Sequence, residues 1–253
     1  MMCGMSRLTD RERERYARHL SLPPIGEDGQ ERLKAARVLI VGLGGLGSSI
    51  ALHLAAAGVG RLALVDPDVV TLSNLQRQVI HGEATLGEAK VESARSRLHD
   101  LNDGVSVEAF REPFTVGSGR RIAAGCDLIV DGTDSFETRY AMNDVCLDLG
   151  IPYVYGAVFQ LEGQMSLFCT KDGPCYRCLF PEPPSSVPTA EEAGILGAVP
   201  GTIGALQAIE AIKWILGIEP CLIGRLLVFD AQAMRFEEIA VAVNPACPSC
   251  SQA

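Results

Sequence analysis

The chain has 253 residues, of which 47% are hydrophobic and 21% charged, and its formal net charge is −9. That length and apolar content allow a large core, as one α/β domain or as one domain with a small appendage. The acidic balance argues against broad nucleic-acid binding, which needs a basic face to displace counterions from phosphates.

No apolar run approaches the roughly 18 residues of a membrane span, and the charged stretch 1–15 lacks the apolar middle of a signal peptide. We therefore expect a cytoplasmic protein that binds neither membrane nor nucleic acid. Nine cysteines are many for a reducing compartment, where disulfides are rare. Metal binding is thus the first role to consider for them.

The first 36 residues predict two helices. Thr9 and Glu12 have the spacing of a capping box, which begins a short charged helix that ends at about Leu20. Two prolines and a glycine within 22–26 interrupt it, and a second helix is expected over 30–36.

A strand, turn, helix, strand pattern follows. The apolar run 37–41 enters a glycine-rich turn, an Ala- and Leu-rich helix is expected over 46–57, and a second strand over 61–66. This order is typical of a βαβ unit with parallel strands. The pattern continues with helices over 90–101 and 137–149 and strands over 105–110 and 127–131.

After Pro152 the segments become short and favour strands with short connections, which indicates an antiparallel extension of the same sheet. The expected strands cover 153–158, 164–169, 225–229 and 236–243. The fold class is therefore predicted to be α/β, with a Rossmann-like parallel half that continues into an antiparallel half.

One long helix is expected over 202–216. An apolar stripe on it is predicted to pack against the core, and a polar stripe lies beside it. The apolar stripe consists of Ile203, Leu206, Ile209, Ile212 and Ile215, and the polar stripe of Gln207, Glu210 and Lys213.

The expected organisation is a single domain in three parts: N-terminal helices (1–36), a nucleotide-binding half (37–150) and an antiparallel half (151–253). Four prolines within 181–188 exclude a helix or an inner strand there. We interpret 180–194 as an extended crossover on the surface.

Glycines at the strand-to-helix turn predict an adenine-nucleotide site. Gly42, Gly44, Gly45 and Gly47 would let the backbone approach a phosphate chain, and the helix N-terminus adds free N–H groups. Asp66 ends the next strand, where a carboxylate can bind ribose hydroxyls. A tight turn without ligand is the alternative, and the glycines alone do not separate ATP from NAD.

The following segment favours ATP. Ser73, Asn74, Arg77 and Lys90 follow the ribose carboxylate closely, and a triphosphate needs more cationic contacts than a pyrophosphate bridge. Ordinary solvated surface residues are an equally open interpretation of Arg77 and Lys90.

A carboxylate after the strand 127–131 is a candidate magnesium ligand. Asp134 follows the carboxyl end of that strand, the edge where ligands bind in open α/β sheets. The alternative is an aspartate that caps the next helix.

Two CxxC pairs predict a structural zinc site. Cys175 and Cys178 precede Cys247 and Cys250 by 68 intervening residues, and two such pairs complete a tetrahedral four-thiolate site. A redox dithiol or a disulfide would not explain the second pair.

Taken together, these motifs resemble the MoeB/ThiF family, relatives of ubiquitin-activating enzymes. The matching stretches keep the family's order along nearly the whole chain: 15–18, 38–47, 72–78, 90–93, 133–134 with Arg139, 175–178, 193–194 and 204–213.

The resemblance implies that the protein adenylates a ubiquitin-like sulfur carrier ending in Gly-Gly, of the kind that serves molybdopterin, thiamine or thiolated-tRNA synthesis. ATP, Mg²⁺ and structural Zn²⁺ are the implied cofactors, with Asp134 on Mg²⁺. Arg77, Lys90 and Arg18 are implied to act in catalysis, with Arg18 reaching into the partner subunit of a homodimer.

Two positions depart from the family. Ala190 stands where many relatives have cysteine, so we expect adenylation only, with sulfur delivered by a separate donor protein. Ser135 replaces the usual asparagine in the nucleotide site, and its hydroxyl has less reach than an amide. A non-catalytic carrier-binding homologue, an NAD-dependent dehydrogenase and a relative acting on a small molecule or an RNA base are the alternatives.

Overall fold

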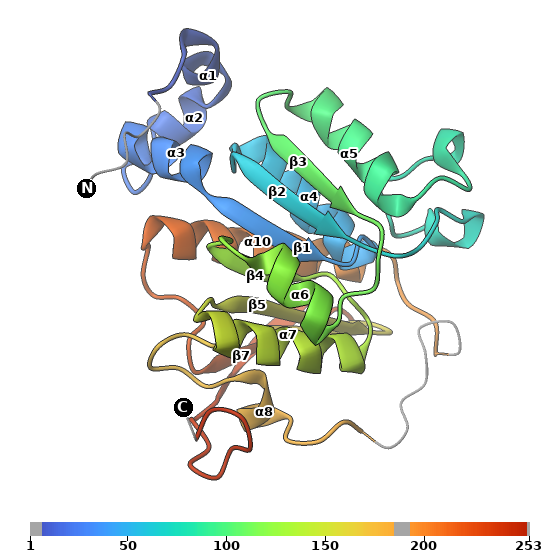
Figure 1. Cartoon of the computed structure of the whole chain (residues 1–253), viewed down its shortest axis with the longest axis vertical. Helices are drawn as coiled ribbons and strands as arrows, with labels where there is room; N and C mark the ends of the chain where they lie inside the picture. The colour runs from blue at the N-terminus through green and yellow to red at the C-terminus, as the bar shows by residue number, and fades with distance from the viewer. Residues whose placement is uncertain (1–6, 185–192, 252–253) are drawn as a thin grey trace.

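The structure, a computed structural model, describes residues 7–184 and 193–251. Eight strands form one sheet in the order β3-β2-β1-β4-β5-β6-β7-β8 (Figure 1). The strands are β1 (Arg37–Val41), β2 (Arg61–Val65), β3 (Ser106–Phe110), β4 (Leu128–Asp131), β5 (Tyr153–Phe159), β6 (Glu162–Phe168), β7 (Arg225–Asp230) and β8 (Arg235–Ala240).

The strand pairing within the sheet changes once, from parallel to antiparallel. Strands β1 to β5 pair in parallel, and β5 to β8 pair in antiparallel order. Strands β1, β2 and β4 are near-continuous apolar runs because helices cover both of their faces. The predicted α/β class with a parallel half and an antiparallel half is confirmed.

Helices cover both faces of the parallel half (Figure 1). The helices are α1 (Asp10–Arg15), α2 (Ala17–Leu20), α3 (Gly26–Ala35), α4 (Gly45–Ala57), α5 (Lys90–Leu101), α6 (Val116–Ala123), α7 (Phe136–Leu149), α8 (Tyr176–Leu179) and α10 (Ala198–Leu216), with 3-10 turns η1 (Leu72–Asn74) and η2 (Glu83–Thr85). One hydrophobic cluster joins α3, α4, α5 and α10 to the sheet, and a second joins α6, α7 and α8 to the other face. None of the helices in the described ranges is both long and apolar enough to cross a membrane.

Most predicted elements agree with the structure to within a few residues. Helices α3 and α10 each begin four residues earlier than expected, and α6 was not predicted. Two glycines lower the helix propensity of α6, but Thr115 accepts a hydrogen bond from the Ser118 N–H (3.2 Å) and caps it.

The predicted packing of α10 is partly wrong. Ile209 is 54% exposed, whereas Gln207 and Glu210 of the supposed polar stripe are buried. Both buried side chains form hydrogen bonds with backbone groups: Gln207 donates to the Asp131 carbonyl (2.8 Å), and Glu210 accepts from the Leu222 N–H. These hydrogen bonds offset part of the cost of burial, although Gln207 Oε1 has no partner among the described residues.

The strand order places a ligand crevice at one edge of the sheet. The chain runs from β1 outward to β2 and β3, and β4 then pairs on the other side of β1. The carboxyl ends of β1 and β4 are therefore a topological switch point, where open α/β sheets bind ligands.

Two glycines of α10 test its packing on α4. A Cβ at Gly204 would lie 2.6 Å from the Leu46 carbonyl oxygen, whereas one at Gly201 would meet nothing within 4 Å. We expect Gly204→Ala to lower the free energy of unfolding by about 1–3 kcal/mol through overpacking. Gly201→Ala, the control, should leave it unchanged or raise it by about 0.5–1 kcal/mol. Urea unfolding measures both, and equal effects would contradict the close contact.

Candidate active site and four-cysteine cluster

The turn after β1 depends on contact between glycine backbones. Gly42 has φ +88°, and its N–H donates to the Val65 carbonyl (2.8 Å). A Cβ on Gly47 would lie 1.9 Å from the Gly42 carbonyl oxygen, and one on Gly132 would lie 2.4 Å from the same atom. Side chains at these positions would force apart the turns that follow β1 and β4.

Asp66 is fastened to this turn. Its carboxylate accepts the Leu43 N–H (2.7 Å) and the Asp68 N–H (2.8 Å), one on each oxygen. Those bonds fix its orientation at the end of β2, while each oxygen keeps a lone pair for another donor.

A cavity of about 950 Å³ opens at the carboxyl ends of the strands, and most of the predicted nucleotide residues line it. Its walls include Gly42, Gly44, Gly45, Asp66, Arg77, Lys90, Asp134 and Ser135. Arg77, Lys90 and Asp134, which lie far apart in the sequence, therefore face one space large enough for a nucleotide.

Two of the cationic side chains that line this cavity, Lys90 and Arg77, are held by local contacts. Lys90 is the first residue of α5, is buried, and pairs with the Asp68 carboxylate (Nζ to Oδ2, 2.9 Å). The Arg77 guanidinium donates to the Ser73 carbonyl (3.2 Å). The turn η1 thus orients Arg77 toward the glycine turn, where its Cγ would lie 3.5 Å from a Cβ on Gly45.

Four predicted site residues lie outside the cavity walls. Gly47 is buried in the first turn of α4, where it packs against Gly42. Ser73 and Asn74 form η1, and the Asn74 carbonyl accepts the Arg77 N–H (3.1 Å). Arg18 is exposed on α2.

Ser135 acts as the cap of α7. Its hydroxyl accepts the Thr138 N–H (3.2 Å), so Ser135, and not Asp134, is the N-cap residue. Asp134 is exposed at the mouth of the cavity and remains available to a cation.

Two buried ionisable groups support the turns. His81 contacts the Leu43 carbonyl (3.2 Å) and the Ser93 hydroxyl (2.9 Å), and burial lowers its pKa. Burial raises the pKa of Asp131 to about 6, against the opposing effect of the Arg139 guanidinium.

The cavity has a second arm along β5 and β6 that no sequence motif indicated. Tyr155 and Gln164 lie on facing strands and are joined by a hydrogen bond from the amide to the phenol oxygen (2.8 Å). Burial raises the pKa of Tyr155 to about 12, so its hydroxyl stays protonated. Further walls of this arm are Ala157, Phe159, Gln160, Gly163, Phe180 and Ile195.

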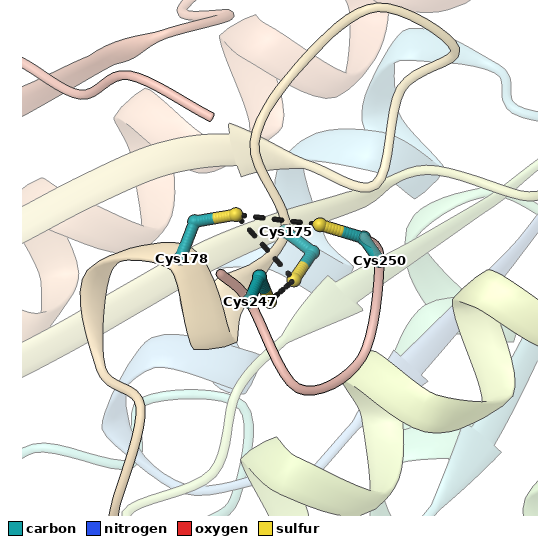
Figure 2. A group of neighbouring side chains, drawn as sticks. All are labelled: Cys175, Cys178, Cys247 and Cys250. Atoms are coloured by element: carbon teal, nitrogen blue, oxygen red, sulfur yellow. Dashed lines mark hydrogen bonds between the residues drawn. The ribbon is translucent and has the colours of Figure 1, made fainter. Parts of the chain in front are cut away.

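The two CxxC pairs converge on one point (Figure 2). The sulfur–sulfur distances are 3.8 Å for Cys175–Cys178, 3.5 Å for Cys175–Cys247 and 3.4 Å for Cys178–Cys250, and all four sulfurs lie within 4.8 Å of one another. Four thiolates at roughly 2.3 Å from a tetrahedral ion would be roughly 3.8 Å apart. The cluster therefore fits a metal ion.

Comparison with known proteins identifies the family. Residues 16–249 match the ThiF family, and the chain belongs to it. It is 47% identical to the SAMP-activating enzyme E1 of Haloferax volcanii, with 94% of this chain and 89% of that protein covered. It is 45% identical to the sulfur carrier protein adenylyltransferase of Thermus thermophilus, with 96% and 93% covered.

A solved structure of E. coli MccB with ATP has the same fold, with a TM-score of 0.81 at 23% identity over 94% of this chain and 74% of that one. The predicted family membership is confirmed. The dehydrogenase and non-catalytic alternatives are not favoured, because relatives that match nearly the full chain are named as activating enzymes or adenylyltransferases.

The cysteine cluster predicts a metal-dependent stability. Cys178→Ser should lower the metal content from about one ion per chain and the Tm by on the order of 10 °C, because metal binding is coupled to folding. Cys126→Ala is the control, since Cys126 is buried outside the cluster and should leave the metal content unchanged. Elemental analysis and thermal unfolding measure both, and a metal-free wild type with unchanged Tm after chelation would contradict the site.

Proposed function

We propose that this chain uses ATP to adenylate the C-terminal carboxylate of a ubiquitin-like sulfur-carrier protein that ends in Gly-Gly. The observation that carries the proposal is the two-armed cavity. One arm joins the glycine turn to Arg77, Lys90 and Asp134, and the other lies along β5 and β6 beside Tyr155 and Gln164.

The nucleotide arm suits ATP. The N–H groups at the start of α4 have no side-chain cap and can bind phosphate oxygens, and Asp66 is oriented for the ribose hydroxyls. Arg77 and Lys90 add two positive charges beside the phosphates. Mg²⁺ held by Asp134 would neutralise further phosphate charge when it is bound.

The reaction requires alignment more than acid–base catalysis. The carrier's terminal carboxyl has an ordinary pKa of about 3.5 and is already an anion at neutral pH, so no general base is needed. One of its oxygens bonds to the α-phosphorus of ATP, and the bond from that phosphorus to the departing pyrophosphate breaks. Arg77 and Lys90 stabilise the charge that develops on the phosphate oxygens.

The second arm suits a thin peptide tail. The small side chain of Ala157 lies in the wall of this arm, and Tyr155 keeps a hydroxyl proton to donate. A Gly-Gly terminus has no side chains to obstruct passage toward the α-phosphate.

The finer assignments rest on the family resemblance and the geometry. We assign Zn²⁺ to the four-cysteine cluster, because a closed four-thiolate site favours that ion. A reducing cytoplasm would keep those thiols available for it. Ala190 lies outside the described residues, and we assign sulfur delivery to a separate donor protein.

The main test is ATP–pyrophosphate exchange with a panel of purified carriers. Exchange should require the intact Gly-Gly terminus, because a shortened tail places its carboxylate away from the α-phosphate. Arg77→Ala should slow exchange by about 10²–10³-fold. Arg97→Ala, an exposed change on α5 outside the cavity, is the control.

Absence of exchange with every carrier would overturn the proposed reaction and favour a carrier-binding scaffold.

A second prediction concerns Arg18, which is exposed on α2 outside the cavity of its own chain. We propose that it completes the partner subunit's site in a homodimer. Arg18→Ala and Lys90→Ala should each be inactive as homodimers. A heterodimer of the two, isolated through two affinity tags, keeps one intact site and should regain about half the activity of the wild-type dimer.

An inactive heterodimer, or a fully active Arg18→Ala enzyme, would contradict action in trans.

A further inference from the structure

The sheet opens between β4 and β5 beneath the cavity. The two strands pair only at Ile129 with Tyr153 and at Val130 with Val154. Beyond these pairs, the backbone of Thr133 on one side and of Gly156 on the other no longer bond to each other. Buried backbone groups in such a gap need other partners.

The ion pair Asp131–Arg139 fills this gap. Arg139 Nε donates to Asp131 Oδ2 (3.0 Å), and both side chains are buried, Arg139 at 4% exposure and Asp131 at 0%. The arginine comes from α7 and the aspartate from the end of β4, so the pair lies where the strands separate.

The pair binds the polar groups of both separated segments. Asp131 Oδ1 accepts the Thr133 N–H (2.9 Å), and Arg139 donates to the Thr133 carbonyl (2.7 Å). The same guanidinium donates to the Gly156 carbonyl (3.2 Å), and the Gly156 N–H lowers the pKa of Asp131. These contacts replace the missing ladder between β4 and β5.

The surroundings leave the guanidinium little freedom. It lies 5.5 Å from the ring centres of Phe136 and of Tyr155. From the opposite face of the sheet, Gln207 donates to the carbonyls of Asp131 (2.8 Å) and Val154 (3.3 Å). A lysine would have the charge but not the planar fork that reaches three acceptors.

The two segments that the pair joins belong to the two arms of the cavity. Thr133 directly precedes Asp134, and Gly156 lies between the tail-arm residues Tyr155 and Ala157. Stability alone does not require an ion pair here, because buried pairs can often be replaced by apolar side chains without loss. A requirement for a fixed spacing between the two arms of the cavity would explain why an ion pair stands here.

We propose that Asp131 and Arg139 are positioning residues. They set the distance between the nucleotide arm of the cavity and strand β5, which forms a wall of the second arm. They act through Asp134 and Gly156 and touch neither substrate's reacting atoms. The inference rests on the proposed adenylation.

The test separates positioning from folding with the double variant Asp131→Leu/Arg139→Met. Its apolar side chains restore packing and leave no buried charge, so its Tm should lie near the wild-type value. The kcat of carrier adenylation should fall about 100-fold or more, because small misplacement of aligned groups is costly. KM for ATP and for the carrier should change by less than about threefold, since each arm still binds its own substrate.

Arg139→Lys is the second variant, for the case in which the double variant fails to fold. It keeps the charge beside Asp131 and should fold, but one ammonium cannot replace the fork, so kcat should fall at least about tenfold with KM values unchanged. A folded variant of either kind with wild-type kcat would overturn the inference, as would a loss confined to KM.

A wild type without exchange activity on any carrier would instead defeat the proposed function itself, so the two failures are distinguishable.

Discussion

The site exists because three stretches of backbone touch without side chains between them. Gly42 follows β1, Gly47 lies in the first turn of α4 and Gly132 follows β4, and a Cβ on Gly47 or Gly132 would overlap the Gly42 carbonyl. This contact lets α4 start directly above the sheet, so that its N–H groups, Asp66 and the turn after β4 face a common cavity. The two carboxylates depend on that contact for their positions, because Asp66 accepts the Leu43 N–H and Asp134 lies two residues after Gly132.

Local charge explains how an acidic protein can bind a polyanion. The net charge is −9, yet Arg77, Lys90 and the start of α4 face one cavity. Lys90 is already paired with Asp68, whose side chain is 64% exposed and can return to solvent when a phosphate takes its place. Asp66 is held by two backbone N–H groups and therefore keeps its place at the end of β2. Over distances longer than the Debye length the acidic surface is screened, so the fixed charges of the cavity decide binding.

The sequence predicted what depends on local pattern. Apolar runs and glycine turns identified the strands and the βα turn, and the CxxC spacing identified the cysteine cluster, because these signals lie within a few residues of one another. It did not predict the burial of Gln207 or the contacts of Arg139, since their partners are carbonyls of strands that separate only in the folded sheet. The sequence did not predict the second arm of the cavity, along β5 and β6, for the same reason. Tyr155 and Gln164 meet through strand register, which no motif encodes.

The cysteine cluster also contributes to the wall of the tail arm. The first CxxC pair includes Tyr176, whose N–H donates to the buried Asn143 side chain (2.9 Å) and whose ring packs on Phe180 (4.9 Å between centres) and Tyr155 (5.4 Å). Phe180 and Tyr155 both line the cavity, and Tyr155 also covers the Arg139 guanidinium. A metal ion that joins this pair to the C-terminal pair would therefore hold one aromatic wall in place. Structural metal and active site are then linked by direct packing, because a shift of Tyr176 cannot occur in a close-packed core without moving its neighbours.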